Sequence, residues 1–235
     1  MINYGKKSLL DAINNNLKIS NVYTTKKQYP FLDQIKNKNF KINIVSEKYF
    51  DNLNNIKHQF IAYEIEKRNL NYKELLSKLS NNNSSIVLIV DSLEDPRNFG
   101  SILRTCDAFN IDAVFYKKDN QASINEVVKS VSMGATNYLD VCEVVNLNNL
   151  INDLKKNDFW IYATTFKENS IPYYNEKFPN KVAIIVGNEN KGISDLVSKN
   201  SDVNIYIPMD GHVQSLNVSV ATGIILSHLK YIKNK

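Results

Sequence analysis

Five consecutive apolar residues, Ile86 to Val90, are followed at once by Asp91. This run constrains the fold more than any other stretch of the chain. A strand with one solvated face alternates apolar and polar residues, whereas a strand covered on both faces is apolar throughout. Parallel sheets are covered in this way, because helical crossovers join their strands. The run therefore predicts a central strand of a mainly parallel sheet, and the fold class is α/β.

The chain after this run alternates further apolar runs with amphipathic stretches, as an α/β domain requires. Strands are expected at 113–116, 160–163, 182–186 and 203–207, and helices at 102–109, 124–131, 147–155 and 217–232. We expect residues 86–235 to form one domain.

A shorter alternation precedes this domain, with a helix expected at 6–12 and extended or helical segments at 19–23, 31–36, 42–45 and 60–63. It predicts a small α/β domain over residues 1–65. A short helix is expected at 69–79, and it is followed by the small polar residues Asn81 to Ser85. Because such residues bury little apolar area, we expect residues 66–85 to be a linker.

Basic residues are concentrated at the front of the chain. Residues 1–80 hold 14 Lys and Arg against 7 Asp and Glu, a net charge of +7, and the remaining residues carry −2. This charge indicates a module that faces a polyanion, although a chain rich in Lys and Asn could show the same excess without that role. Only three basic residues are arginines, namely Arg68, Arg97 and Arg104.

Several classes of protein are disfavoured by what the sequence lacks. No apolar run approaches the roughly 20 residues that span a bilayer, and no secretory or transit signal is recognisable at residues 1–16. Cys106 and Cys142 form neither a disulfide framework nor a metal-binding spacing, so we expect a cytoplasmic protein without a metal. Glycine-rich dinucleotide and P-loop motifs are absent.

Three segments carry residues that the fold alone would not need. The first contains Asn98, Gly100 and Arg104, the second contains Gly187, Glu189 and Gly192, and the third runs from Ile207 to Ala221. Each has a purely structural interpretation: a helix cap at Asn98, a left-handed turn at the glycines, and a helix cap at Ser215 or Asn217.

Together these segments resemble the SpoU (TrmH) family of RNA ribose 2′-O-methyltransferases, within the SPOUT superfamily. The family patterns NxGxxxR, GxExxG and IPMxGxxxSLNVSxA are met in the family's order and spacing, the third without a departure. The third pattern fixes about ten positions, so coincidence is negligible.

The resemblance implies S-adenosylmethionine as methyl donor, a deep trefoil knot in the catalytic domain and a homodimer whose active site draws on both protomers. It implies cofactor contacts at Thr164, Gly187, Ile207 and Leu216. The catalytic residues that it implies are Arg104, Asn98, Glu189, Ser215 and Asn217. Because a guanidinium has a pKa above about 12, we expect Arg104 to position the 2′-hydroxyl and stabilise the forming alkoxide rather than act as a base.

The front of the chain resembles the L30e-like substrate-binding domain of the bacterial 23S rRNA (guanosine-2′-O-)methyltransferase branch. The resemblance of this domain rests on Tyr4-Gly5 and on His58-Gln59, after which Phe60 departs from the Gly that is usual there. The segment 129–138, in the second domain, also resembles that branch. The resemblance implies a guanosine in 23S rRNA as the target. Three alternatives stay open: a tRNA 2′-O-methyltransferase, a thiostrepton-resistance type enzyme and a catalytically silent RNA-binding assembly factor.

Overall fold

A computed structural model describes residues 2–35, 39–51, 58–66, 70–119, 121–189 and 191–233. The chain forms two compact units, Met1–Arg68 and Asn69–Lys235. Lys36, Arg68 and Asn69, which belong to segments or residues singled out in the sequence, lie outside the described ranges.

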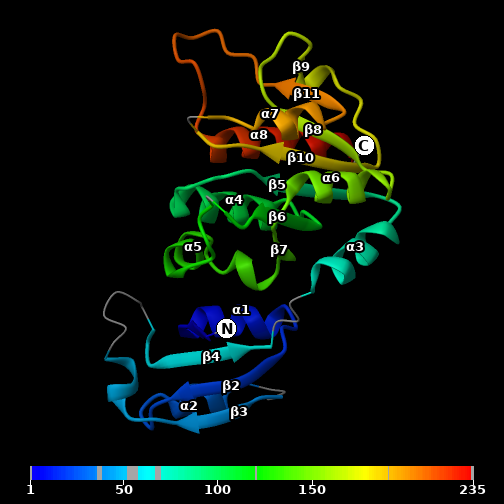
Figure 1. The fold of residues 1–235 in the computed structure, drawn as a ribbon. Helices are drawn as coiled ribbons and strands as arrows, with labels where there is room; N and C mark the ends of the chain where they lie inside the picture. The colour runs from blue at the N-terminus through cyan, green and yellow to red at the C-terminus, as the bar shows by residue number, and fades with distance from the viewer. Residues whose placement is uncertain are drawn as a thin grey trace. The chain divides into compact units, whose positions relative to one another are not determined.

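The second unit is built on a seven-stranded sheet in which every pair of neighbouring strands is parallel. The strand order is β7-β6-β5-β10-β8-β11-β9, and the strands follow one another in this order in Figure 1. Their bounds are β5 Ser85–Val90, β6 Ala113–Lys117, β7 Val141–Val144, β8 Trp160–Thr164, β9 Ile171–Pro172, β10 Lys181–Val186 and β11 Val203–Tyr206. The predicted fold class is confirmed.

Helices cover both faces of this sheet. They are α3 Tyr72–Ser80, α4 Pro96–Ala108, α5 Glu126–Val131, α6 Leu147–Lys155, α7 Asp195–Lys199 and α8 Val218–Lys233. Strand β5 shows the consequence, since Ile86, Leu88 and Val90 belong to the core with α4, α5 and α8. Val87 and Ile89 belong to the other core, with α3, α6 and α7. A strand buried on both sides is what the apolar run predicted.

The first unit contains a four-stranded sheet of order β1-β4-β2-β3. Its elements are β1 Ile2–Tyr4, α1 Lys6–Asn14, β2 Ile19–Thr24, α2 Tyr29–Asp33, β3 Lys41–Ile44 and β4 Ile61–Ile65. Strand β4 is antiparallel to β1 and β2, whereas β2 and β3 are parallel. One core holds the unit together, with Leu9, Val22, Leu32 and Tyr63 almost fully buried.

The segment expected to be a linker, 66–85, contains α3, which the structure assigns to the second unit. Asn71 begins this helix with a capping box that it shares with Glu74. Leu75 and Leu79, four residues apart, are buried in one of the two cores of the second unit. Tyr72 and Leu76 pack against the same core, so one apolar face docks the helix on the sheet.

The start of α4 differs from the expectation. The helix begins at Pro96 rather than at 102, and its N-cap is Asp95, not Asn98. The side chain of Asp95 accepts a hydrogen bond from the backbone N–H of Arg97 at 2.8 Å, and proline is well suited to the first helical position. Asn98 therefore lies inside the helix, where its side chain is available for other contacts.

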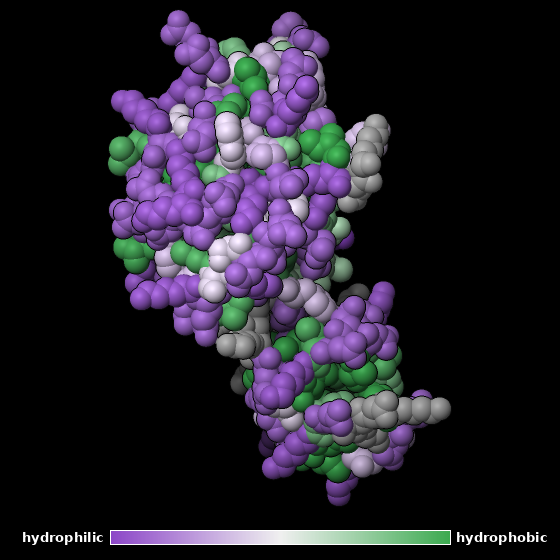
Figure 2. Space-filling model, turned by 90° about the vertical axis from the view of Figure 1, so that its right-hand side faces the viewer, coloured by the Kyte–Doolittle hydropathy of each residue, from purple (hydrophilic) through white to green (hydrophobic). Residues whose placement is uncertain are grey.

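Figure 2 shows one face of the second unit. Hydrophilic side chains cover most of its visible face, and apolar residues are scattered between them (Figure 2). Apolar residues scattered singly are normal on a protein surface. In the described ranges no helix is long and apolar enough to cross a bilayer.

Candidate active site

A cavity of about 620 Å³ opens in the second unit beyond the carboxyl ends of β8 and β11. Its volume falls within the range of small-molecule sites. The lining comes from three stretches, 164–166, 205–209 and 213–216, together with Ala221 and Ile225 of α8. Four of the predicted site residues, Thr164, Ile207, Ser215 and Leu216, lie in this lining.

Two hydrogen bonds fix the wall that follows β8. The hydroxyl of Thr164 donates to the carbonyl oxygen of Ile185 in β10 at 2.8 Å. The backbone N–H of Thr165 donates to the carbonyl oxygen of Ile205 in β11 at 2.9 Å. The wall is thus joined to both strands that neighbour β8.

Another wall is formed by residues 205–209 and 213–216, from the end of β11 and the loop between β11 and α8. This loop projects from the sheet in Figure 1. The loop ends at Asn217, whose Oδ1 accepts hydrogen bonds from the backbone N–H of Ser219 at 2.9 Å and from its hydroxyl at 2.6 Å. Asn217 is therefore the cap of α8. It is one of the two caps, Ser215 or Asn217, that the structural interpretation of the third motif predicted. Its Nδ2 remains available for a second contact.

That second contact joins the three motifs. Nδ2 of Asn217 donates to Oδ1 of Asn98 at 3.1 Å, and Nδ2 of Asn98 donates to Oε1 of Glu189. These residues lie 91 and 119 positions apart in sequence. The ends of β5, β10 and β11 meet at one edge of the sheet, as expected for parallel strands. We call Asn98, Glu189 and Asn217 the polar cluster.

Arg104 stands apart from the polar cluster and from the cavity lining. Its side chain is exposed and makes no hydrogen bond or ion pair within the described part of the chain. Arg97, also exposed and with an unpaired guanidinium among the described residues, precedes it by seven positions on α4. Seven residues are nearly two full helical turns, so the two arginines share one face of the helix.

The flanks of this arginine face are occupied by neighbouring helices. A Cβ placed on Gly100 would lie 2.8 Å from Cβ of Val131 in α5, so the two helices approach closely there. Across the helix, a Cβ on Gly223 of α8 would lie 3.9 Å from a methyl of Thr105. The arginine face between these contacts is left open.

The second motif forms a tight turn after β10. The backbone N–H groups of Asn188 and Gly192 donate to each other's carbonyl oxygens at 3.0 and 2.8 Å. A Cβ on Gly187 would lie 2.3 Å from the carbonyl carbon and oxygen of Gly192, and Gly192 has φ of +66°. Both glycines are needed by the turn itself. Gly187, expected as a cofactor contact, is not part of the cavity lining.

Asp91 is a residue that the sequence analysis did not select for the site. It is 2% exposed, and its carboxylate accepts hydrogen bonds from the backbone N–H of Ser194 at 3.1 Å and the hydroxyl of Ser92 at 2.9 Å. Nδ2 of Asn188 donates to the carbonyl oxygen of Ser92 at 2.9 Å. These bonds join the end of β5 to the turn after β10. The available signal was a charged residue directly after a buried strand.

In the first unit, the segment His58-Gln59-Phe60 contains the position at which Gly is usual in the resembled family and this chain has Phe. Gln59 and Phe60 both have a left-handed backbone, with φ of 52° and 54°. Glycine adopts this conformation most easily. The ring of Phe60 makes edge-to-face contacts with Phe50 and His58, at centroid distances of 5.6 and 5.0 Å. Aromatic packing therefore offsets part of the strain that a glycine would avoid.

Among the described residues, no group of three or more His, Cys, Asp or Glu side chains is placed to hold a metal ion.

Sequence profiles of two families match the chain. The SpoU rRNA methylase family matches residues 85–227, and the substrate-binding domain of RNA 2′-O ribose methyltransferases matches residues 2–70. The two profiles thus correspond to the two compact units.

Individual proteins match over nearly the full length. A Mycoplasma pneumoniae protein, named an uncharacterized tRNA/rRNA methyltransferase, is 37% identical over 95% of this chain and 94% of its own length. The fold resembles the rRNA methyltransferase of Sinorhizobium meliloti, with a TM-score of 0.79, 20% identity and coverage of 98% of this chain and 87% of that one. It also resembles the SpoU methyltransferase AviRb from Streptomyces viridochromogenes, with a TM-score of 0.80, 16% identity and coverage of 100% and 91%.

Proposed function

The chain belongs to the SpoU rRNA methylase family, and we propose that this S-adenosylmethionine-dependent RNA methyltransferase acts on a ribose 2′-hydroxyl of a guanosine in 23S rRNA. One observation carries the proposal. Ser215 and Leu216 line the cavity, and the next residue, Asn217, belongs to the polar cluster. A small-molecule cavity and a set of convergent polar groups therefore adjoin each other, as an active site requires.

The cavity suits S-adenosylmethionine. The Sinorhizobium and Streptomyces proteins were crystallised with this molecule bound. Ile207 and Leu216 offer apolar surface for the adenosyl group, and the side chains of Thr164 and Ser215 offer hydroxyls. When bound, the cofactor supplies an electrophilic methyl group on a sulfonium.

The residues of the chain must then orient the ribose and manage its proton. A ribose 2′-oxygen would have to be held in line with the methyl group that the cofactor supplies, so positioning by the residues of the chain would provide much of the catalysis. In this mechanism Arg104 holds the adjacent phosphate through its planar fork and stabilises the developing alkoxide, while the proton passes to water. The polar cluster orients the ribose through groups fixed by their mutual hydrogen bonds.

We propose that the active site is completed in a homodimer, with Arg104 of one protomer serving the cavity of its partner. Two observations support this arrangement. Arg104 does not line the cavity, and apolar side chains of the cavity lining are exposed. Met209 and Val213, both part of the cavity lining, are 40% and 65% exposed. We also propose that the catalytic domain forms the deep trefoil knot that the family resemblance implies.

Complementation tests the shared site. Arg104→Ala leaves a protomer with an intact cavity, and Ala221→Phe fills the cavity, because Ala221 is part of its lining. Neither variant is expected to methylate RNA alone. Co-refolded mixtures should regain up to about a quarter of wild-type activity. No recovery, with mixed dimers shown by mass spectrometry, would contradict the shared site.

The choice between rRNA and tRNA rests on the first unit. A full front domain favours rRNA, because the tRNA enzymes of this family often lack such a domain. The matched substrate-binding profile names no RNA class, and the Mycoplasma relative is named for both substrates. The silent assembly factor is disfavoured, because such a protein would not need the polar cluster and Arg104 together.

The experiment is transfer of labelled methyl from S-adenosylmethionine to purified 23S rRNA and, separately, to bulk tRNA, both lacking ribose methylation. Label in 23S guanosine supports the proposal. Label in tRNA alone would make tRNA the substrate and leave the proposed ribose methylation unchanged. Absence of label in both would favour the assembly factor.

A further inference from the structure

Phe166 is a large apolar side chain that the fold leaves in solvent. It is 78% exposed, the highest value among the large apolar side chains of the described residues. The ring nevertheless lies at the cavity, which Phe166 lines together with Tyr206. The two rings make an edge-to-face contact with centroids 4.8 Å apart and planes at 70°. Most of the surface of the Phe166 ring is open.

The turn that carries Phe166 is fixed on both sides by backbone and side-chain hydrogen bonds. The hydroxyl of Ser170 donates to the carbonyl oxygen of Thr165 at 2.9 Å and accepts from the backbone N–H of Lys167 at 2.8 Å. The backbone N–H of Ser170 donates to the carbonyl oxygen of Lys167 at 3.0 Å. One side chain therefore bridges the residues just before and just after Phe166.

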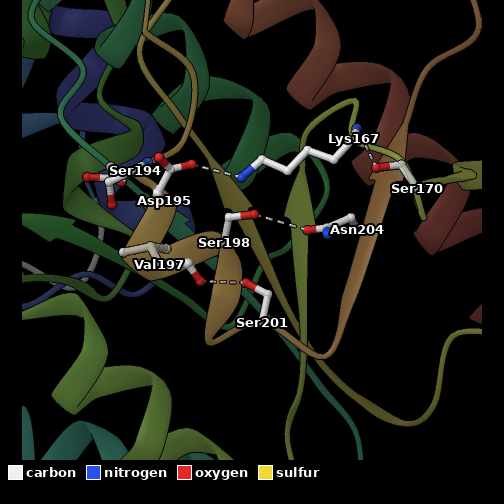
Figure 3. Close-up of polar contacts among 9 residues, drawn as sticks. Lys167, Ser170, Ser194, Asp195, Val197, Ser198, Ser201 and Asn204 are labelled. Carbon is white, nitrogen blue, oxygen red and sulfur yellow. Dashed lines mark hydrogen bonds and ion pairs between the residues drawn. The ribbon is translucent and has the colours of Figure 1, made fainter.

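An ion pair adds a weaker restraint to the same turn. Nζ of Lys167 lies 3.0 Å from Oδ1 of Asp195 at the start of α7 (Figure 3). Both side chains are well exposed, at 39% and 86%, so this pair contributes little by itself. Ser170 is the principal support.

From this arrangement we propose that Phe166 packs on the adenosyl group of S-adenosylmethionine and forms the outer wall of its site. A turn held at several points keeps an aromatic ring in water beside an apolar cavity, and a planar heteroaromatic ligand would cover that ring. Aromatic rings gain from such contact beyond the area they bury. The inference rests on the proposal that the cofactor occupies this cavity.

The direct test is the Kd of S-adenosylmethionine, measured by calorimetry on full-length protein. We expect Phe166→Ala to raise Kd about tenfold, which corresponds to about 1.4 kcal/mol. Phe166→Tyr should stay within threefold of the wild type. Val145→Ala is the matched control, because Val145 is 73% exposed and lies outside the cavity lining. An unchanged Kd for Phe166→Ala would overturn the proposal.

The part of the ligand that Phe166 contacts is tested with fragments. Methylthioadenosine retains the adenosyl group and lacks the amino acid. Phe166→Ala should therefore raise the Kd of methylthioadenosine by the same factor as the Kd of S-adenosylhomocysteine. If Phe166→Ala weakened the binding of S-adenosylhomocysteine alone, the contact with the adenosyl group would be refuted. Dissociation of the Phe166→Ala protein in light scattering would instead make Phe166 a contact of the partner subunit, and would also refute it.

Two further variants separate the possible failures. Ser170→Ala should weaken binding in the wild type but not in the Phe166→Ala background, because Ser170 acts through Phe166. Equal effects in both backgrounds would reduce Ser170 to a general structural role and would contradict the turn's part in the proposal. If Ala221→Phe abolishes binding while Phe166→Ala does not, only the assignment of Phe166 is wrong; if neither variant affects binding, the cavity assignment is wrong.

Discussion

Substitution of Gly187 tests the packing of the turn after β10. An alanine Cβ would lie 2.3 Å from the carbonyl carbon and oxygen of Gly192 and 2.5 Å from the backbone nitrogen of Ile193. Backbone atoms must therefore move by roughly 1 Å to reach van der Waals contact. Such a shift breaks the two hydrogen bonds between Asn188 and Gly192, each worth about 1 kcal/mol. We expect Gly187→Ala to lower the free energy of unfolding by about 2–3 kcal/mol.

Trp160, at the start of β8, is the single tryptophan of the chain, so its fluorescence reports the second unit alone. The expected loss corresponds to a Tm lower by about 4–12 °C for a unit of this size. Gly192→Ala should cost about 1 kcal/mol, because only its left-handed backbone opposes a side chain. Gly211→Ala, with open space around its Cβ, should change the Tm little. Equal Tm values for the Gly187 and Gly211 variants would refute this explanation of the turn.

Four further results are expected. Arg104→Lys keeps the charge and loses the fork, so single-turnover methylation should fall at least about 100-fold with an unchanged Kd for S-adenosylmethionine; near wild-type turnover would contradict the positioning role. Arg97→Ala should raise KM for RNA several-fold and reduce the slope of log affinity against log salt by about one, whereas an unchanged slope would exclude a phosphate contact. Burial raises the pKa of both the Cys106 and the Cys142 thiols, so both stay protonated at pH 8, and Ellman's reagent should label neither until the protein unfolds; rapid labelling of the folded protein would refute the burial. Deletion of residues 1–68, which spares α3, should abolish RNA binding in gel-shift assays and leave cofactor binding intact, and unchanged RNA affinity would overturn this division of labour.

Elements with a complete local pattern were predictable from sequence. Helix α6 has the expected bounds, because its cap at Asn146 and its apolar spacing agree. The run at β5 predicted burial on both faces, and both cores confirm it. Elements of two to five residues, such as β9 and α7, carry too few positions for a period to emerge.

The site was predictable only in part, for a related reason. Motif matching selected Asn98, Glu189 and Asn217, and parallel strands that end at one edge explain why these residues meet. It could not tell that Gly187 serves its own turn, because a close backbone approach within the chain and one to a ligand require the same residue type. The exposed ring of Phe166 left no sequence signal, because its position depends on hydrogen bonds made by Ser170.

The chemical position of the transferred methyl group decides whether the cavity and the polar cluster form a ribose methyltransferase site. Labelled 23S rRNA would be digested to nucleosides and resolved by mass spectrometry, with Asn98→Ala and Arg104→Ala proteins as controls. We expect label only in 2′-O-methylguanosine, and we expect both variants to lose it. Label on a base, or undiminished ribose label in the two variants, would contradict the assignment of chemistry to this site.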